Sequence, residues 1–147
     1  PRGDYQLIVS SMQPAGAGNL MHQFEELKKK LDAEGLFAQA VKKSIPKQPK
    51  HIGIITSEST AAFQDILTTI QRRAPVSQVS LIPAMVQGDT APRALIKALQ
   101  STLSFNNLYP ENAFDVILMC RGGGSIEDLW HLTMRALQEK YLIILCL

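Results

Sequence analysis

A glycine-rich string offers the clearest chemistry in this sequence: Arg121 is followed by Gly122, Gly123, Gly124 and Ser125. Backbone N–H groups of consecutive glycines can approach an anion closely, and the start of a following helix adds partial positive charge. The guanidinium of Arg121 adds a permanent cation whose planar donors suit phosphate. The plainer interpretation is that the glycines only make a tight turn between a strand and a helix. The arginine directly before them favours phosphate binding.

Hydroxyl side chains gather in a short polar segment earlier in the chain, at Thr56, Ser57, Ser59 and Thr60. The simplest role of such residues is to cap the helix that follows them. The same hydroxyls can donate to phosphate, so Thr56 and Ser57 are candidate phosphate-binding residues.

Asp65 lies five residues beyond Thr60. It falls roughly opposite the apolar stripe of Phe63, Ile66 and Ile70, so composition alone indicates a solvated surface position. A catalytic carboxylate is the alternative interpretation.

The elements that must position these residues alternate between strand and helix from residue 51 onward. Apolar runs at 52–55, 79–82 and 116–119 predict strands, and stripes through 63–70 and 95–103 predict helices. This alternation predicts an α/β fold with an open, mostly parallel, flavodoxin- or Rossmann-like sheet and flanking helices. Ligands of such sheets bind beyond the carboxyl ends of the strands, so Thr56, Gln87 and Arg121 should lie near one edge.

A strand and an amphipathic helix are expected before this domain. Residues 4–10 alternate in polarity as a strand does, with no partner nearby in the sequence, so we expect this strand to pack poorly or to swap onto another molecule. Asn19 is a candidate cap for a helix that runs to Leu31 and stops near Gly35. Residues 42–50 hold four lysines and two prolines, which indicates a basic linker.

Composition bounds the remaining possibilities. The chain has 147 residues, 46% of them hydrophobic and 19% charged, which suits one domain with an appendage. No long apolar run or signal-like start is present, so we expect no membrane contact and a cytoplasmic location. The two cysteines and three histidines lack metal-ligand spacing, so no metal ligands are assigned. A formal charge of +2 is too small to indicate nucleic acid, and the local distribution must decide.

Eight strings, in this order, resemble the large subunit of exodeoxyribonuclease VII: PRGDYQLIV, SMQPAGAG, LKKKLDAEGLF, IGIITS, AAFQDIL, RRAP, VQGDTAP and RGGGSIEDLW. The resemblance implies that residues 1–13 are the last strand of an OB-fold, 14–50 a connector helix with the basic linker, and 51–147 part of a nuclease domain. It further implies hydrolysis of single-stranded DNA to oligonucleotides, and a coiled coil that recruits small subunits in the full-length protein.

The same resemblance implies site residues. Asp65 matches the aspartate of the family's AAxxD segment, and Arg121 matches the arginine of its RGGGS segment, so both are candidate catalytic residues. Mg²⁺ is a possible cofactor that the sequence does not settle. One departure is Thr60, where many relatives have glycine.

The sequence leaves the family pattern after Trp130. Relatives usually continue with an aromatic residue, a short Asn/Asp-Glu string and later a GHExxD motif, whereas this chain continues from His131 to Arg135 as HLTMR. Inserting one T into plausible codons for these five residues yields HFNNE, which is the family pattern. We therefore hypothesise that residues 132–147 are an out-of-frame tail and that the chain is an internal fragment, inactive alone.

Two functions from different classes remain. The first is a fragment of a single-stranded-DNA exonuclease. The second is a non-catalytic, flavodoxin-like module that binds a nucleotide or another phosphate ligand in the same crevice. A preference for longer single-stranded oligonucleotides over mononucleotides separates the two.

Overall fold

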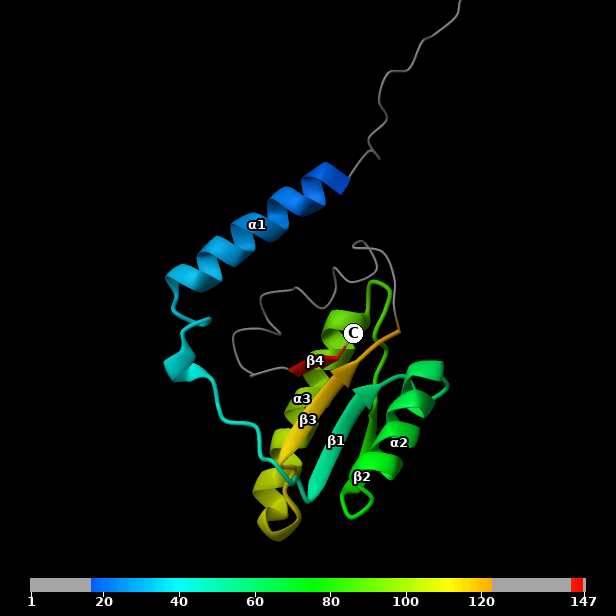
Figure 1. The fold of residues 1–147 in the computed structure, drawn as a ribbon. Helices are drawn as coiled ribbons and strands as arrows, with labels where there is room; N and C mark the ends of the chain where they lie inside the picture. The colour runs from blue at the N-terminus through cyan, green and yellow to red at the C-terminus, as the bar shows by residue number, and fades with distance from the viewer. Residues whose placement is uncertain (1–16, 123–143, 147) are drawn as a thin grey trace, which may run out of the picture.

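The computed structural model describes residues 17–122 and 144–146 (Figure 1). Its order is α1 (Ala17–Ala33), a 3-10 turn η1 (Gln39–Val41), β1 (His51–Thr56), α2 (Ala61–Arg73), β2 (Gln78–Pro83), α3 (Ala91–Leu108), a 3-10 turn η2 (Pro110–Asn112), β3 (Val116–Cys120) and β4 (Ile144–Cys146). The expected strand at 4–10 lies outside the described residues, as does most of the hypothesised tail. Along the part of the chain that is described, no helix is long and apolar enough to cross a membrane.

The four strands form one parallel sheet in the order β2-β1-β3-β4. Ile55 of β1 lies between Ile82 of β2 and Met119 of β3. The short strand β4 pairs with the outer side of β3, where Ile144 lies opposite Leu118. This strand order is that of flavodoxin-like sheets, so the expected α/β fold with an open parallel sheet is confirmed.

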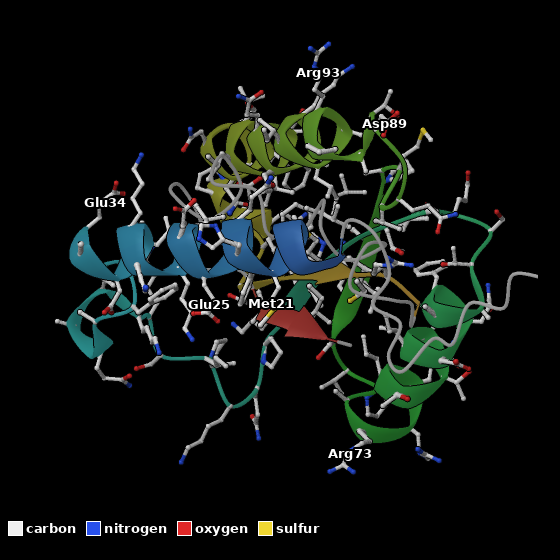
Figure 2. All side chains as sticks on the ribbon, turned by 90° about the horizontal axis from the view of Figure 1, so that it is seen from above. Met21, Glu25, Glu34, Arg73, Asp89 and Arg93 are labelled. Atoms are coloured by element: carbon white, nitrogen blue, oxygen red, sulfur yellow. The ribbon has the colours of Figure 1, made fainter. Side chains whose placement is uncertain are left out.

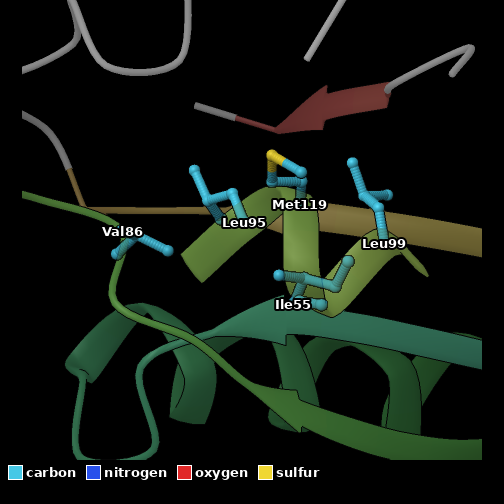
Figure 3. Close-up of a cluster of buried hydrophobic side chains, with 6 residues drawn as sticks. Ile55, Val86, Leu95, Leu99 and Met119 are labelled. Carbon is cyan, nitrogen blue, oxygen red and sulfur yellow. The ribbon is translucent and has the colours of Figure 1, made fainter. Parts of the chain in front are cut away.

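Helices α2 and α3 cover opposite faces of the sheet (Figures 1 and 2). The reason is topological: the chain moves from β1 to β2 in one direction and from β2 to β3 in the other, and right-handed crossovers then place the two helices on different faces. The main core lies between the sheet and α3, and Figure 3 shows Ile55 and Met119 of the sheet against Leu95 and Leu99 of α3, with Val86 beside them. All six residues of β1 are buried, as expected for a central strand covered on both sides.

The predicted helix boundaries hold at one end of α1 and fail at the other. Gly35 has φ +75°, Leu36 N donates to Leu31 O at 3.1 Å, and Gly35 N donates to Asp32 O at 2.8 Å. This is a Schellman motif, which confirms the predicted stop. The predicted start was wrong, because α1 begins at Ala17 and contains Asn19. The first turn of a helix has no preceding carbonyls to bond, so its start is less sharply set by sequence than its end is here.

The amino ends of the strands form a tightly bonded edge centred on His51, which is 4% exposed. Its Nδ1 donates to the carbonyl of Asn112 at 2.7 Å, and its Nε2 lies 2.8 Å from Ser80 Oγ. The Asp115 carboxylate accepts from the backbone N–H groups of Lys50 and His51 at 2.6 and 3.0 Å. Both ring nitrogens therefore have partners at this amino edge.

Candidate functional site

The carboxyl ends of the parallel strands bring the sequence-predicted residues to the opposite edge of the sheet. Thr56 ends β1, Arg121 directly follows β3, and Gln87 lies in the exposed loop after β2. Because Ile55 lies opposite Met119, the Cα atoms of Thr56 and Arg121 are separated by one strand spacing and about one residue, roughly 6 Å. This is also where the chain order reverses, with β2 on one side of β1 and β3 on the other. Such a switch point is the usual ligand site of open α/β sheets.

Arg121 is the most unusual residue at this edge. Its side chain is 7% exposed, yet neither Nε nor Nη1 has a hydrogen-bond partner within the described part of the chain. A buried cation without a partner is costly, so native arginines in such positions are normally paired with an anion. A buried guanidinium with two nitrogens that lack partners among the described residues is thus suited to accept an anionic ligand at this switch point.

Thr56 repeats the same pattern on the neighbouring strand. It is fully buried, at 0% exposure, and its Oγ1 meets no partner among the residues that the structure covers. Burying a hydroxyl without a hydrogen bond costs about 1–3 kcal/mol. Both of these residues, each with buried polar atoms that lack a partner among the described residues, therefore lie at the carboxyl ends of neighbouring strands.

The loop after β1 is fixed to the loop after β2 by Ala84. Ala84 N donates to the carbonyl of Thr56 at 3.0 Å, and Ser57 Oγ donates to the carbonyl of Ala84 at 3.1 Å. The only hydroxyl hydrogen of Ser57 is thus already used, and a phosphate could receive it only if this bond were exchanged. The sequence analysis missed Ala84, because it acts through backbone groups that no side chain reveals.

Thr60 has a definite structural role in this loop. It is the N-cap of α2: its Oγ1 accepts from Phe63 N at 3.4 Å and donates to Ser57 O at 3.0 Å. Its φ of −95° is readily adopted by threonine, so this position does not require glycine. The capping interpretation is confirmed for Thr60, and it is not seen for Ser57.

Asp65, the other candidate catalytic residue, lies on the helix that follows the first of these loops. It lies in the second turn of α2, is exposed, and forms no ion pair with the guanidinium. Gly122 is exposed and a Cβ added there would meet no atom within 4 Å. The remaining predicted residues, Gly123, Gly124 and Ser125, lie outside the described part of the chain. Within that part, no group of three or more His, Cys, Asp or Glu residues could hold a metal ion.

Comparison with known proteins decides the family. The family model "Exonuclease VII, large subunit" matches residues 36–142, a range that includes every candidate site residue. The chain belongs to this family. The matched range also reaches into the segment 132–147, for which the out-of-frame origin stays a hypothesis.

Curated relatives agree with the family model. The exodeoxyribonuclease 7 large subunits of Photobacterium profundum, Vibrio parahaemolyticus and Geobacillus kaustophilus are 53%, 52% and 48% identical over 130 residues, which is 88% of this chain. The chain spans 28% of the length of each of these relatives.

Proposed function

We propose that this chain is part of an exodeoxyribonuclease acting on single-stranded DNA and that it binds substrate phosphates at the carboxyl edge of the sheet. The observation that carries the proposal is the buried guanidinium of Arg121, whose Nε and Nη1 have no partner among the described residues, in a chain of this family. A phosphodiester supplies the negative charge and the acceptor oxygens that this side chain lacks.

The proposed reaction is hydrolysis of a phosphodiester bond. Water adds to phosphorus, the bond to the leaving oxygen breaks, and that oxygen takes up a proton. Arg121 stabilises the charge that develops on the phosphoryl oxygens, while Asp65 orients the attacking water; if a Mg²⁺ ion were bound, Asp65 would hold it and the ion would polarise the phosphate. Since Asp65 is exposed and forms no ion pair with Arg121 here, we propose that bound DNA or the rest of the protein completes their approach.

The phosphate contacts are proposed to come from both loops at this edge. Thr56 donates through its hydroxyl, and the glycine-rich string donates through the backbone N–H groups of Gly122, Gly123, Gly124 and Ser125. Ser57 contributes mainly by holding the loop against Ala84. A nucleotide-binding module without catalysis is the weaker alternative, because no observation in the structure favours it over the family's own activity.

The wider assignments remain proposals of the same kind. We propose a cytoplasmic enzyme whose full-length form binds small subunits through a coiled coil. Residues 1–13 are assigned to the end of an OB-fold, 14–50 to a connector and 51–147 to part of the nuclease domain.

The test is an end-labelled single-stranded oligonucleotide incubated with the purified chain and assayed for retention and for degradation. We expect retention that weakens with salt and that Arg121→Ala reduces alike for all sequences, because phosphate contacts carry no sequence information. Arg73→Ala, at the far end of α2, is the matched control for loss of one positive charge. Binding of a mononucleotide as tight as that of the oligonucleotide would favour the nucleotide-binding alternative.

Cleavage by the isolated chain is expected to be undetectable. No GHExxD string occurs in the sequence, and loss of general acid–base help costs about two to four orders of magnitude in rate. Robust cleavage that Asp65→Ala abolishes would show that the chain holds a complete active site.

A further inference from the structure

The linker between α1 and β1 carries an unbalanced positive charge. Lys42, Lys43 and Lys47 are all exposed, and no acidic residue occurs from residue 35 to residue 57. None of the three forms an ion pair within the described residues. Figure 1 shows this segment leading from α1 to the start of β1.

The lysines of α1 provide a contrast within the same chain. Lys28, Lys29 and Lys30 are equally exposed, but the helix also carries Glu25, Glu26 and Asp32, so three positive charges face three negative ones. Lys28 Nζ lies 3.9 Å from Glu25 Oε1. An anionic polymer is therefore attracted far less to α1 than to the linker.

The linker is anchored at its end by hydrogen bonds, and Lys42 within it has an extended backbone conformation. Lys42 has φ −78° and ψ 130°, and Pro46 and Pro49 restrict the segment further. Ser77 Oγ donates to the Pro49 carbonyl at 2.7 Å, and Gln78 N donates to the Lys50 carbonyl at 2.7 Å. A segment held in this way loses less conformational freedom on binding a ligand than a loose one would.

Large apolar side chains alternate with these lysines. Phe37, Val41 and Ile45 are 44%, 53% and 62% exposed, at four-residue spacing along the same stretch. Aromatic side chains next to basic ones are typical of surfaces that hold single-stranded nucleic acid, because bases stack while the cations contact phosphates.

We propose that residues 37–47 form a second binding surface for single-stranded DNA, with Lys42, Lys43 and Lys47 on the phosphates and Phe37 on a base. The inference rests on the proposed function. The linker joins β1 at its amino end, whereas Arg121 lies at the carboxyl edge, and the six residues of β1 span about 16–20 Å between the end of the linker and that edge. A single DNA strand must therefore be several nucleotides long to contact both surfaces.

The experiment compares two triple variants of the chain that each remove three positive charges. Lys42→Gln/Lys43→Gln/Lys47→Gln tests the linker, and Lys28→Gln/Lys29→Gln/Lys30→Gln is the matched control on α1. The affinity for a long oligothymidylate is measured by fluorescence anisotropy between 50 and 200 mM salt, with circular dichroism to verify folding. Each phosphate contact on a single strand contributes about 0.7 to the slope of log affinity against log salt, so the linker variant should lose a slope of about 2.

Between 50 and 200 mM salt, the affinity of the linker variant should therefore fall by a factor on the order of 20 less than the affinity of the unmodified chain. The control should keep the slope of the unmodified chain. A dinucleotide should bind the linker variant and the unmodified chain alike, because it is too short to reach from Arg121 to the linker. Equal slopes for both triple variants would overturn the linker inference while leaving the Arg121 site intact. Failure of the unmodified chain to bind any oligonucleotide would overturn both.

Discussion

The buried polar side chains at the two edges of the sheet differ in whether they have hydrogen-bond partners. At the amino edge, both ring nitrogens of His51 have partners, and Asp115 N donates to the His51 carbonyl at 2.9 Å. At the carboxyl edge, Thr56 and Arg121 are just as buried, but Thr56 Oγ1 and two guanidinium nitrogens have none among the described residues.

This difference separates stability from function. A buried polar group with its partners in place contributes to stability, whereas one without partners costs free energy that a ligand can recover. We therefore expect substitutions at the amino edge to weaken folding without affecting DNA binding. Substitutions at the carboxyl edge should do the reverse.

The largest effect on folding is expected for His51→Leu. It removes both ring contacts and leaves the Ser80 hydroxyl and the Asn112 carbonyl without them, at a cost of about 2–3 kcal/mol in the free energy of unfolding. Urea denaturation measures this, with His22→Leu on the exposed face of α1 as the control, expected within about 0.5 kcal/mol of the unmodified chain. Equal stabilities of the two variants would show that the contacts of His51 at the amino edge do not stabilise the fold.

A smaller effect of opposite sign is expected for Thr56→Val. The substitution removes a buried hydroxyl that has no partner in the described part of the chain, so it should stabilise the chain by about 1 kcal/mol while weakening oligonucleotide binding. The matched control is Thr102→Val, because Thr102 is also buried but donates to Leu99 O at 2.7 Å. That variant should be less stable by about 1 kcal/mol. Destabilisation by Thr56→Val as well would mean that its hydroxyl is satisfied.

The smallest effect concerns the pH dependence of the amino edge. Hydrogen bonds from the backbone N–H groups of His51 and Lys50 lower the pKa of Asp115 below its usual value of 3.8. A lowered pKa in the folded state means that Asp115 stabilises the fold above pH 3.8 and that this contribution is lost as the pH falls through the folded-state pKa. Asp115→Asn should flatten the acid side of a plot of stability against pH. If the variant lost stability at low pH as steeply as the unmodified chain does, Asp115 would not be the source of this pH dependence.

The sequence predicted the sheet well because the information is local. The apolar runs at 52–55, 79–82 and 116–119 each fell inside an observed strand, and the stripe of Leu95 and Leu99 packs on the sheet as expected. Parallel order then brought Thr56 and Arg121 to one edge without any further information.

Other features depend on contacts between distant segments and could not be predicted in this way. The link through Ala84 uses backbone groups only, and the three residues of β4 become a strand by pairing with β3. The burial of Arg121 was also not foreseen, because an arginine beside glycines is normally expected at the surface.

The most direct test of the central claim is the stability of Arg121→Met with and without a single-stranded oligonucleotide, with Arg73→Met as the control. Because Nε and Nη1 of Arg121 have no partners among the described residues, the methionine variant should be at least as stable as the unmodified chain when no DNA is present. Oligonucleotide at 100 times its Kd should stabilise the unmodified chain and the control by about 2.7 kcal/mol, and Arg121→Met far less. Strong destabilisation of Arg121→Met without DNA, together with a full gain on adding it, would show that the arginine serves the fold and does not bind phosphate.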